Sequence, residues 1–386
     1  MELIAGPNFS GRSEALMARL RERAPAFFIG PHAEAALSGL SSTVADEIEI
    51  YRAPKLAHAP FTPLDFAAYA DRKPPTLSGG EQVLLALHCF SLSCYAAIGV
   101  DTALEQLDPG NRERALIYLS QDTAQNIAAI IADNRADRVD HVVGMTVREM
   151  TSTEGEFACD LAGVAHLPSR APVTISVQGL SFRYPGGRDI FRDASATLEP
   201  GSAYRLTGVN GAGKTTFLKL LAGVLAPDAG RIELDGKPYA PWQSGNRAFG
   251  FATQNPDHQW CGATLAEDIA RRRSVLTRRD FNVPPDEALA ALAACLGVRS
   301  MDQHLYELPL VARKRLSWLW PFAGVMPWAM LDEPTLGQDR ATRAALAGAI
   351  ARLTGSGYGV VFITHDDDFA SRIAHRPLTI ADGSIG

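Results

Sequence analysis

The stretch TGVNGAGKTTFLKLLAGVL, residues 207–225, contains the pattern GxxxxGK[ST], which begins at Gly208. An apolar, strand-like run precedes this pattern and a helical run follows it. Glycines let backbone N–H groups turn inward around phosphates, and a helix N-terminus adds positive potential. The lysine reaches the β and γ phosphates, and the threonine offers its hydroxyl to magnesium. This context argues against a simple glycine-rich turn with an exposed lysine. The predicted nucleotide contacts are Asn210, Gly211, Gly213, Lys214, Thr215 and Thr216.

Five further positions in the same half carry groups suited to nucleotide chemistry. The apolar run WAML ends at Asp332, which can hold magnesium, and at Glu333, which can polarise the attacking water as a general base. His365 ends the run VVFITH as a candidate γ-phosphate contact, and Gln254 in ATQNPD is a candidate for the water and magnesium shell. Tyr184 in FRYPGG could stack on adenine. Taken singly, these residues also fit an acidic turn, a structural histidine and a packed tyrosine, and their order along the chain favours the site.

The chain contains an internal repeat. Asp332 and Asp339 are seven residues apart, as are Asp101 and Asp108 in the front half. Twenty-four residues before the first aspartate of each pair, the sequence reads LSGGE from residue 77 and LPLVA from residue 308, without a gap. We therefore predict a tandem duplication, with a small-residue, proline-containing linker at 161–173 and domains at residues 1–165 and 172–386.

The order GVNGAGKTT, ATQNPD, LDEPTLGQD, ITHDDD resembles an ATP-binding-cassette ATPase over the whole second half, and the repeat extends the resemblance over the first. The resemblance implies an α/β fold with two P-loop NTPase cassettes in tandem, the first truncated and degenerate. It also implies ATP and Mg²⁺ as ligands. Such cassettes pair head to tail, and each ATP lies between the phosphate loop of one and the LSGGQ-type signature of the other. Here the pairing is expected within one chain, in place of a homodimer.

The first half departs from the motif at most catalytic positions, so we predict that it does not hydrolyse ATP. Its expected replacements are Phe9 for Gly211, Arg12 for Lys214, Gly30 for Gln254, Thr102 for Glu333 and Asp133 for His365. Arginine keeps the charge of lysine but not its compact ammonium. Only five residues precede the loop, so no counterpart of Tyr184 is expected. The spacing from Gly11 to Gly30 is too short for a small antiparallel sheet.

The second half has lost the complementary motif. Pro309, Leu310 and Val311 stand where the signature would supply a serine and two glycines. The first half keeps that signature, with predicted ATP contacts at Ser78, Gly79, Gly80 and Glu81. One composite site would therefore join the second phosphate loop to the first signature, and the other site would combine two damaged faces.

Composition supports a globular protein and argues against a nucleic-acid partner. The 386 residues are 46% hydrophobic and 21% charged, and the net charge is -6. The start, MELIAGPN, lacks a basic and an apolar region, so export is not expected. The five cysteines show no CxxC pair, which favours free thiols. Two uncharged runs, 83–100 and 316–331, are too short or too interrupted to span a membrane and fit buried helix followed by strand.

Within the family, the segments RYPGGRDIF, FGFATQNPDHQWCGATLAEDIA and DDDFASRIAHRPLTIADGSI resemble the ATPase subunits of energy-coupling-factor importers, which take up vitamins or metal ions. This resemblance implies that a transmembrane transporter subunit docks near the helix after Gln254. It places the protein on the cytoplasmic face of the cell membrane as a peripheral subunit.

Two other function classes remain open. A soluble twin cassette acting on ribosomes or DNA would usually carry a basic linker, a coiled-coil insertion or an iron–sulfur cysteine cluster, and the sequence shows none. The run RRRSVLTRRD, residues 271–280, is its one basic patch, and we interpret it as a solvated helix. A non-hydrolytic ATP sensor is the second class, against which the intact Glu333 and His365 argue.

Overall fold

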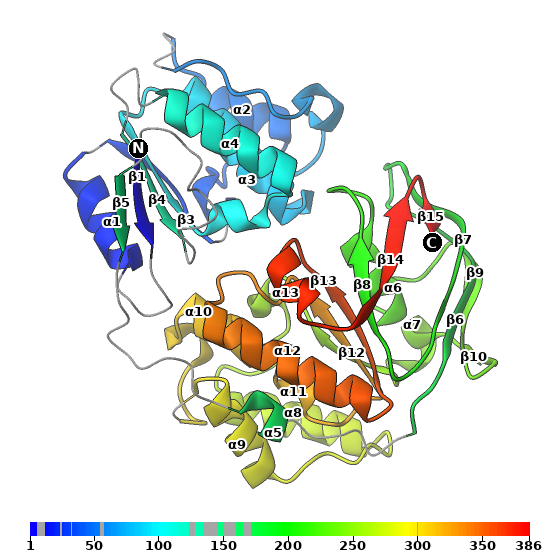
Figure 1. The fold of residues 1–386 in the computed structure, drawn as a ribbon. Coiled ribbons are helices and arrows are strands. Elements are labelled where there is room, and N and C mark those ends of the chain that lie inside the picture. The colour runs from blue at the N-terminus through cyan, green and yellow to red at the C-terminus, as the bar shows by residue number, and fades with distance from the viewer. Residues whose placement is uncertain are drawn as a thin grey trace. The chain divides into compact units, whose positions relative to one another are not determined.

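A computed structural model describes residues 1–5, 12–23, 25–31, 33–54, 58–122, 128–133, 146–149, 160–164, 171–298 and 300–386. The chain divides into two compact units (Figure 1). The first comprises Met1–Glu156 with Leu336–Arg340, and the second comprises Phe157–Thr335 with Ala341–Gly386. Each unit contains a parallel sheet with helices beside it, so the predicted α/β class is confirmed.

The first unit is built on a five-stranded sheet of order β2-β3-β4-β1-β5, and all its pairs are parallel. The strands are β1 (Glu2–Ala5), β2 (Ala26–Ile29), β3 (Ala97–Asp101), β4 (Ala128–Asp133) and β5 (Thr146–Glu149). The helices are α1 (Arg12–Arg21), α2 (Val44–Tyr51), α3 (Gly79–Leu92) and α4 (Pro109–Asp122), with short 3-10 helices at Ala33–Ala36, Phe66–Tyr69, Pro74–Thr76 and Ala103–Gln106.

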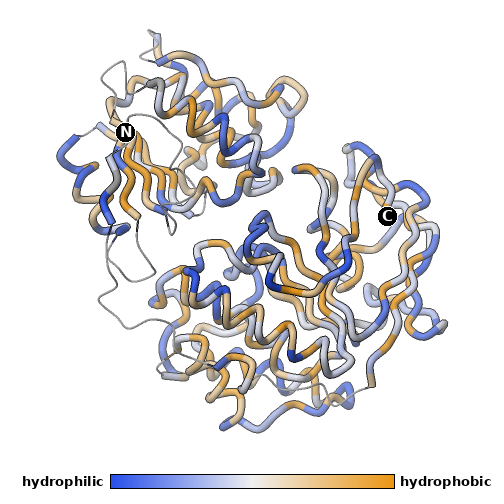
Figure 2. The backbone as a smooth tube through the Cα atoms, in the orientation of Figure 1, coloured by the Kyte–Doolittle hydropathy of each residue, from blue (hydrophilic) through white to orange (hydrophobic). Residues whose placement is uncertain are grey.

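Alternation along these strands places helices on both faces of the first sheet. Leu3 and Ile131 face the cluster that contains α3, whereas Ile4 and Ile130 face α1. Successive side chains of a strand point to opposite faces, and a parallel sheet covered on both sides needs apolar residues on each. Hydrophobic residues accordingly run along the central strands (Figure 2).

The second unit contains a six-stranded sheet of order β11-β12-β13-β8-β14-β15 and an antiparallel sheet of order β10-β9-β6-β7. The strands are β6 (Ile175–Arg183), β7 (Asp189–Leu198), β8 (Ala203–Thr207), β9 (Ala229–Leu234), β10 (Lys237–Tyr239), β11 (Phe249–Ala252), β12 (Trp328–Asp332), β13 (Gly359–Ile363), β14 (His375–Ala381) and β15 (Ser384–Ile385). The helices are α5 (Leu161–Val164), α6 (Lys214–Leu221), α7 (Pro241–Ser244), α8 (Leu265–Thr277), α9 (Asp286–Cys295), α10 (Leu310–Leu316), α11 (Leu319–Phe322), α12 (Arg340–Gly355) and α13 (Asp367–Ser371), with 3-10 helices at Pro256–His258 and Leu305–Glu307.

The six-stranded sheet separates two cores. On one face Met330 and Val361 pack with α6 and the antiparallel sheet. On the other face Leu331 and Phe362 pack with the helical segment from α8 to α12. The phosphate-loop helix and the helical segment therefore approach the same strands from opposite sides, and both can contribute to a site at the strand ends.

The two parallel sheets share one topology. The order β2-β3-β4-β1-β5 matches β11-β12-β13-β8-β14 strand for strand. The predicted offset of 231 residues also holds, because Leu77 and Leu308 each close a short 3-10 helix and Ser78 and Pro309 each cap the helix that follows. Within the described residues, the first unit has no counterpart of the antiparallel sheet, as its shorter spacing predicts.

An unusual backbone conformation is repeated in both units. Thr102 has φ 54° and Glu333 has φ 48°, and each follows the last residue of the central strand. Thr102 donates its N–H to the Ala132 carbonyl at 2.8 Å, and Glu333 donates to the Ile363 carbonyl at 3.0 Å. The left-handed region costs a non-glycine residue about 1–2 kcal/mol. The first unit thus keeps the strained turn although its carboxylate is gone.

Strand pairing corrects two predicted correspondences by one residue. Asp101 pairs with Ala132 as Asp332 pairs with Ile363, so Asp133 occupies the position of Thr364. The His365 position falls on residue 134, outside the described residues.

The other correction lies at the edge of each sheet. Ile29 pairs with Val100 as Ala252 pairs with Leu331, so Gly30 matches Thr253, and Pro31 stands at the position of Gln254. The loops that precede these strands differ in length, and only the hydrogen-bonded ladder fixes the alignment.

Two other sequence predictions can be compared with the structure. The prediction of free thiols holds for Cys89, Cys94 and Cys261 but is wrong for Cys295, which is disulfide-bonded. In the part of the chain that the structure describes, no helix is both long enough and apolar enough to cross a membrane. The uncharged runs form buried helix and strand, as predicted.

Candidate active site

The phosphate loop connects β8 to α6 through three glycines with positive φ. These angles are 148° at Gly208, 77° at Gly211 and 108° at Gly213. A Cβ atom at Gly208 would lie 2.6 Å from the carbonyl oxygen of Ile380, which is backbone and cannot move aside cheaply. Only glycine fits this turn, so the loop can wrap closely around an anion at the N-terminus of α6.

Lys214 is the first residue of α6, and its side chain returns over the loop. The ammonium Nζ donates to the carbonyl oxygens of Gly208 at 2.7 Å and Val209 at 3.2 Å. The positive charge therefore lies at the mouth of the loop, where a triphosphate would bring negative charge.

A hydroxyl and a carboxylate meet beside this loop. Asp332 is 2% exposed at the end of β12 and forms a side-chain hydrogen bond with Thr215. Burial, with the neighbouring charge of Glu333, raises the pKa of Asp332 to about 6, against the opposing effects of Lys314 and Thr215. Among the described atoms, Oδ2 of Asp332 has no hydrogen-bond partner.

This donor set fits Mg²⁺. Magnesium takes oxygen ligands and is usually held by one or two side chains together with phosphate oxygens and water. A buried carboxylate oxygen that lacks a donor is a natural ligand, and the Thr215 hydroxyl lies beside it. The described residues contain no group of three acidic, histidine or cysteine side chains that could hold a metal alone. The site therefore suits a metal that arrives with a nucleotide, and Mg²⁺ would there neutralise phosphate charge.

Glu333 and His365 face each other at the ends of neighbouring strands. The Nε2 atom of His365 lies 3.5 Å from Oε1 of Glu333, and Glu333 is 8% exposed. A carboxylate in this position can accept a proton from water, and the imidazole can orient both the carboxylate and a phosphate oxygen. The structure thus brings Asp332, Glu333 and His365 together, although they lie far apart from the loop in sequence.

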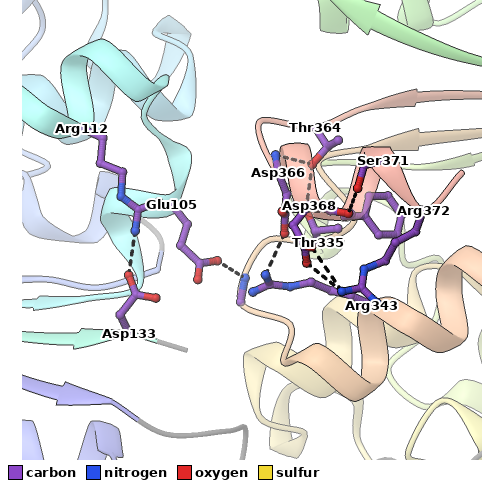
Figure 3. A network of polar contacts seen from close by, with 12 residues as sticks. Glu105, Arg112, Asp133, Thr335, Arg343, Thr364, Asp366, Asp368, Ser371 and Arg372 are labelled. Atoms are coloured by element: carbon purple, nitrogen blue, oxygen red, sulfur yellow. Dashed lines mark hydrogen bonds and ion pairs between the residues drawn. The ribbon is translucent and has the colours of Figure 1, made fainter. Parts of the chain in front are cut away.

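A buried network fixes the segment on either side of His365 (Figure 3). The Arg343 guanidinium pairs with Asp366 at 2.7 Å, and both side chains are almost fully buried. Asp366 also accepts the Phe369 N–H at the start of α13, while the hydroxyls of Thr335 and Thr364 share a hydrogen bond of 2.9 Å. In the first unit, Arg112 pairs with Asp133 at 3.0 Å from the corresponding helix.

Gln254 lies on the loop that follows β11, which is the strand next to β12. The carbonyl oxygen of Gln254 accepts a hydrogen bond of 2.6 Å from Nζ of Lys314, a residue that the sequence reasoning did not select. Burial lowers the pKa of Lys314 to about 8, against the opposing charges of Asp332 and Glu333. A basic residue in VARKRL resembles a surface lysine, so no local signal identified it.

Tyr184 lies at the end of β6 and lines an open hollow of about 490 Å³. Its hydroxyl is 3.2 Å from the Thr216 hydroxyl, and its ring meets Phe182 edge-on. The ring is 38% exposed, which leaves a face available for stacking on a base. The hollow is lined by Arg183, Tyr184, Pro185, Gly186, Gly187 and Asp228.

The signature segment of the first unit starts α3 with a complete capping box. The Ser78 hydroxyl accepts the Glu81 N–H at 3.4 Å, and the Glu81 carboxylate accepts the Ser78 N–H at 2.7 Å. Gly79 and Gly80 form the first turn, so no side chain covers the helix N-terminus there. In the second unit Pro309 caps α10 without a side-chain hydrogen bond, and Leu310 and Val311 fill the first turn.

The first unit keeps more of a magnesium-type pair than the sequence reasoning recognised. Asp101 is buried and forms a side-chain hydrogen bond with Ser13, as Asp332 does with Thr215. Burial raises the pKa of Asp101, while Ser13 and Arg12 act in the opposite direction. The predicted loop residue Phe9 lies outside the described residues. The hydroxyl–carboxylate pair is therefore common to both units, and Glu333 belongs to one.

The segment after Gln254 is organised around one buried acid. Asp268 is fully buried and accepts hydrogen bonds from the Cys261 N–H at 2.8 Å and from Nε1 of Trp320 at 3.1 Å. It also pairs with Arg272 at 3.0 Å, and that guanidinium stacks over Trp320. Asp268 is thus a structural residue of the loop, and Glu267 is the exposed acid.

The basic run at residues 271–280 is not the solvated patch that the sequence predicted. Arg271 donates to the Cys261 carbonyl at 2.6 Å, and Arg273 donates to the Pro284 carbonyl at 2.7 Å and to Asp286 at 2.6 Å. Together with the pairing of Arg272, these contacts direct most of the charge into the protein's own loops.

The loop, the buried Asp332 and the Glu333–His365 pair define a P-loop nucleoside triphosphatase. Residues 191–336 match the family model described as ABC transporter. The chain is 33% identical over 222 residues to the energy-coupling factor transporter ATP-binding protein EcfA1 of Lactiplantibacillus plantarum, with 55% of this chain and 76% of that protein covered. It is 30% identical over 220 residues to the cobalt import ATP-binding protein CbiO of Rhodobacter capsulatus, with the same coverage. The chain belongs to the family of ABC transporter ATPases.

Longer proteins match as well. The chain spans 38%, 37% and 34% of the length of three further curated relatives. Among solved structures, an RNase-L inhibitor is similar with a TM-score of 0.59 and 17% identity, over 100% of this chain and 85% of that one. That likeness shows the fold alone, and it extends over both cassettes.

Glu333 provides the first test of the site. Glu333→Gln keeps the shape and hydrogen-bonding capacity of the side chain but removes the base, so ATP turnover should fall roughly 10²- to 10⁴-fold while ATP still binds. Steady-state phosphate release and equilibrium binding of a fluorescent ATP analogue measure the two effects. Near-normal turnover would remove Glu333 from this role.

Asp268 provides a test of stability with a matched neighbour. Asp268→Ala leaves Arg272 and the Trp320 N–H without their buried acceptor and should lower the free energy of unfolding by roughly 3–5 kcal/mol. Glu267→Ala removes an exposed acid and should change it by less than about 0.5 kcal/mol. Urea denaturation of the two variants gives the comparison, and equal effects would contradict the structural role of Asp268.

Proposed function

We propose that this protein binds and hydrolyses ATP with Mg²⁺ in its second cassette. The observation that carries the proposal is the cluster of Asp332, Glu333 and His365 beside a phosphate loop in which Lys214 and Thr215 are in place. In this scheme the loop and Lys214 bind the phosphates, Tyr184 stacks on the base, and Glu333 takes the proton from the attacking water. Gln254 orients that water, and His365 holds Glu333 and the γ-phosphate.

The proposed cassettes span residues 1–165 and 172–386, and we propose that they pair within the chain. Each half offers one usable face: the second has the phosphate loop and Glu333, and the first has an uncovered helix N-terminus at Ser78, Gly79 and Gly80. A helix N-terminus attracts anions, whereas Leu310 and Val311 would obstruct a phosphate. The first half has Thr102 at the position of Glu333, so hydrolysis is assigned to the composite site alone.

We further propose that ATP hydrolysis drives a membrane transporter of the energy-coupling-factor type, which imports a vitamin or a metal ion. The names of two relatives, an energy-coupling factor transporter protein and a cobalt import protein, support this class. A transmembrane subunit would dock near the segment after Gln254, and the protein would lie on the cytoplasmic face of the cell membrane. No nucleic-acid partner is proposed.

A soluble twin-cassette ATPase acting on ribosomes is the second candidate, because the RNase-L inhibitor fold covers the whole chain. The two candidates differ in what the protein accompanies in a cell extract. Affinity purification from detergent-solubilised membranes, with identification of the co-purifying protein, supports the transporter if an integral membrane protein is recovered. Co-sedimentation with ribosomes in an ATP-dependent manner would support the alternative instead.

The composite site predicts an effect of the first half on catalysis in the second. Ser78→Arg places a bulky side chain at the helix N-terminus that would face the ATP bound at Lys214, so it should abolish most turnover. Pro309→Arg makes the same change at the corresponding position of the other half and should cost little. Arg12→Ala should also cost little beyond any effect on folding.

Turnover is measured on folded protein, with circular dichroism melts as the control for folding. A severe effect of Arg12→Ala or Pro309→Arg with a mild effect of Ser78→Arg would contradict the assignment and place hydrolysis in the first half.

The docking proposal predicts a separate effect on the complex. Glu267 is an exposed acid in the first turn of α8, with its side chain half exposed. Glu267→Arg should weaken recovery of the membrane partner and leave basal ATP turnover unchanged, since Glu267 lies outside the proposed catalytic groups. Pull-down yield and turnover are measured on the same preparation. Loss of turnover with an intact complex would show that the segment serves the active site instead.

A further inference from the structure

Lys314 is a lysine buried in the second unit. It is 3% exposed and lies in α10. Its ammonium donates to three backbone carbonyl oxygens, those of Thr253 at 2.9 Å, Gln254 at 2.6 Å and Asp332 at 3.1 Å. An ammonium has three donors, and burying it costs free energy unless the donors are used. These three bonds account for all three donors.

The three acceptors lie on two segments of the proposed active site. Thr253 and Gln254 follow β11, and Asp332 ends β12. The ladder between these strands ends at the pair of Ala252 and Leu331, so the acceptors lie just beyond the last paired residues. Backbone carbonyls that leave a sheet need new donors. Lys314 supplies them from a helix on one face of the sheet, and it joins the Gln254 loop to the residue next to Glu333.

The first unit acts as an internal comparison. At the offset of 231 residues, Val83 takes the place of Lys314 and is fully buried. The carbonyl of Pro31, at the Gln254 position, instead accepts a hydrogen bond of 2.7 Å from the amide of Gln106. The same sheet topology therefore forms without a buried lysine. The ammonium occurs in the unit that has both the glutamine and the glutamate, and a role in building the fold does not explain it.

We propose that Lys314 is a positioning residue for hydrolysis, which holds the Gln254 loop at a fixed distance from the Asp332–Glu333 end of β12. This inference rests on the proposed ATPase function. Lys314 acts through backbone carbonyls and does not touch the nucleotide. Its removal should therefore leave the phosphate loop and Tyr184 in place, and it should loosen the spacing between the side chains that hold water and those that accept its proton.

The test is Lys314→Met in the full chain, with Lys237→Met as the matched control on exposed β10. Methionine retains an unbranched stem of similar length but cannot donate. We expect kcat to fall about 10- to 100-fold, as for other residues that orient a first ring of ligands, with binding of a fluorescent ATP analogue changed less than about twofold. The Mg²⁺ concentration for half-maximal turnover should rise. Lys237→Met should match the wild type in all three measurements.

An unchanged kcat in Lys314→Met overturns the inference, as does a loss of ATP-analogue binding in proportion to kcat, which indicates a merely structural role. If Lys314→Met does not fold, Lys314→Gln keeps two donors and should give an intermediate kcat with normal ATP-analogue binding, whereas wild-type kcat in that variant overturns the inference. Glu333→Gln is measured alongside. Wild-type turnover that is insensitive to Glu333→Gln defeats the proposed function, and turnover that needs Glu333 but tolerates Lys314→Met defeats the role of Lys314 alone.

Discussion

Parallel pairing of β8, β12 and β13 is the constraint on which the site depends. Strands that run the same way end at the same edge, so the phosphate loop after β8, the acids after β12 and His365 after β13 reach one place. Each group comes from a different stretch of sequence, and each is useful only beside the others. The glycine turn at Gly208 then lets the loop approach without a side chain in the way.

The two units show how one scaffold can keep its backbone while its chemistry changes. Both retain the strand order, the capped helix at the signature position and the left-handed residue after the central strand. The buried arginine–aspartate pair is also present in both, although the aspartate has moved along the chain from the position of Asp133 to that of Asp366. Features that support the strand ends have been kept, and the groups that would act on phosphate differ.

Burial explains which differences matter. A charged side chain inside a protein must be paired or hydrogen-bonded, and the second unit contains three such groups near the site: Lys314 on carbonyls, Arg343 on Asp366, and Asp268 with Arg272 and Trp320. Each ties a loop at the sheet edge to a helix behind it. The Gln254 loop, the His365 segment and the segment before α8 are thereby fixed to separate helices.

The sequence by itself determined the phosphate loop, the acids after β12 and the duplication at an offset of 231 residues, because these depend on local spacing along one element. It could not assign Gly30 and Asp133 correctly, since loops of unequal length precede them and only the ladder of strand hydrogen bonds sets their register. It also could not tell that Lys314 and Asp268 are buried while Glu267 is exposed. Charged residues on short helices look alike in sequence, and packing against distant segments decides which of them face inward.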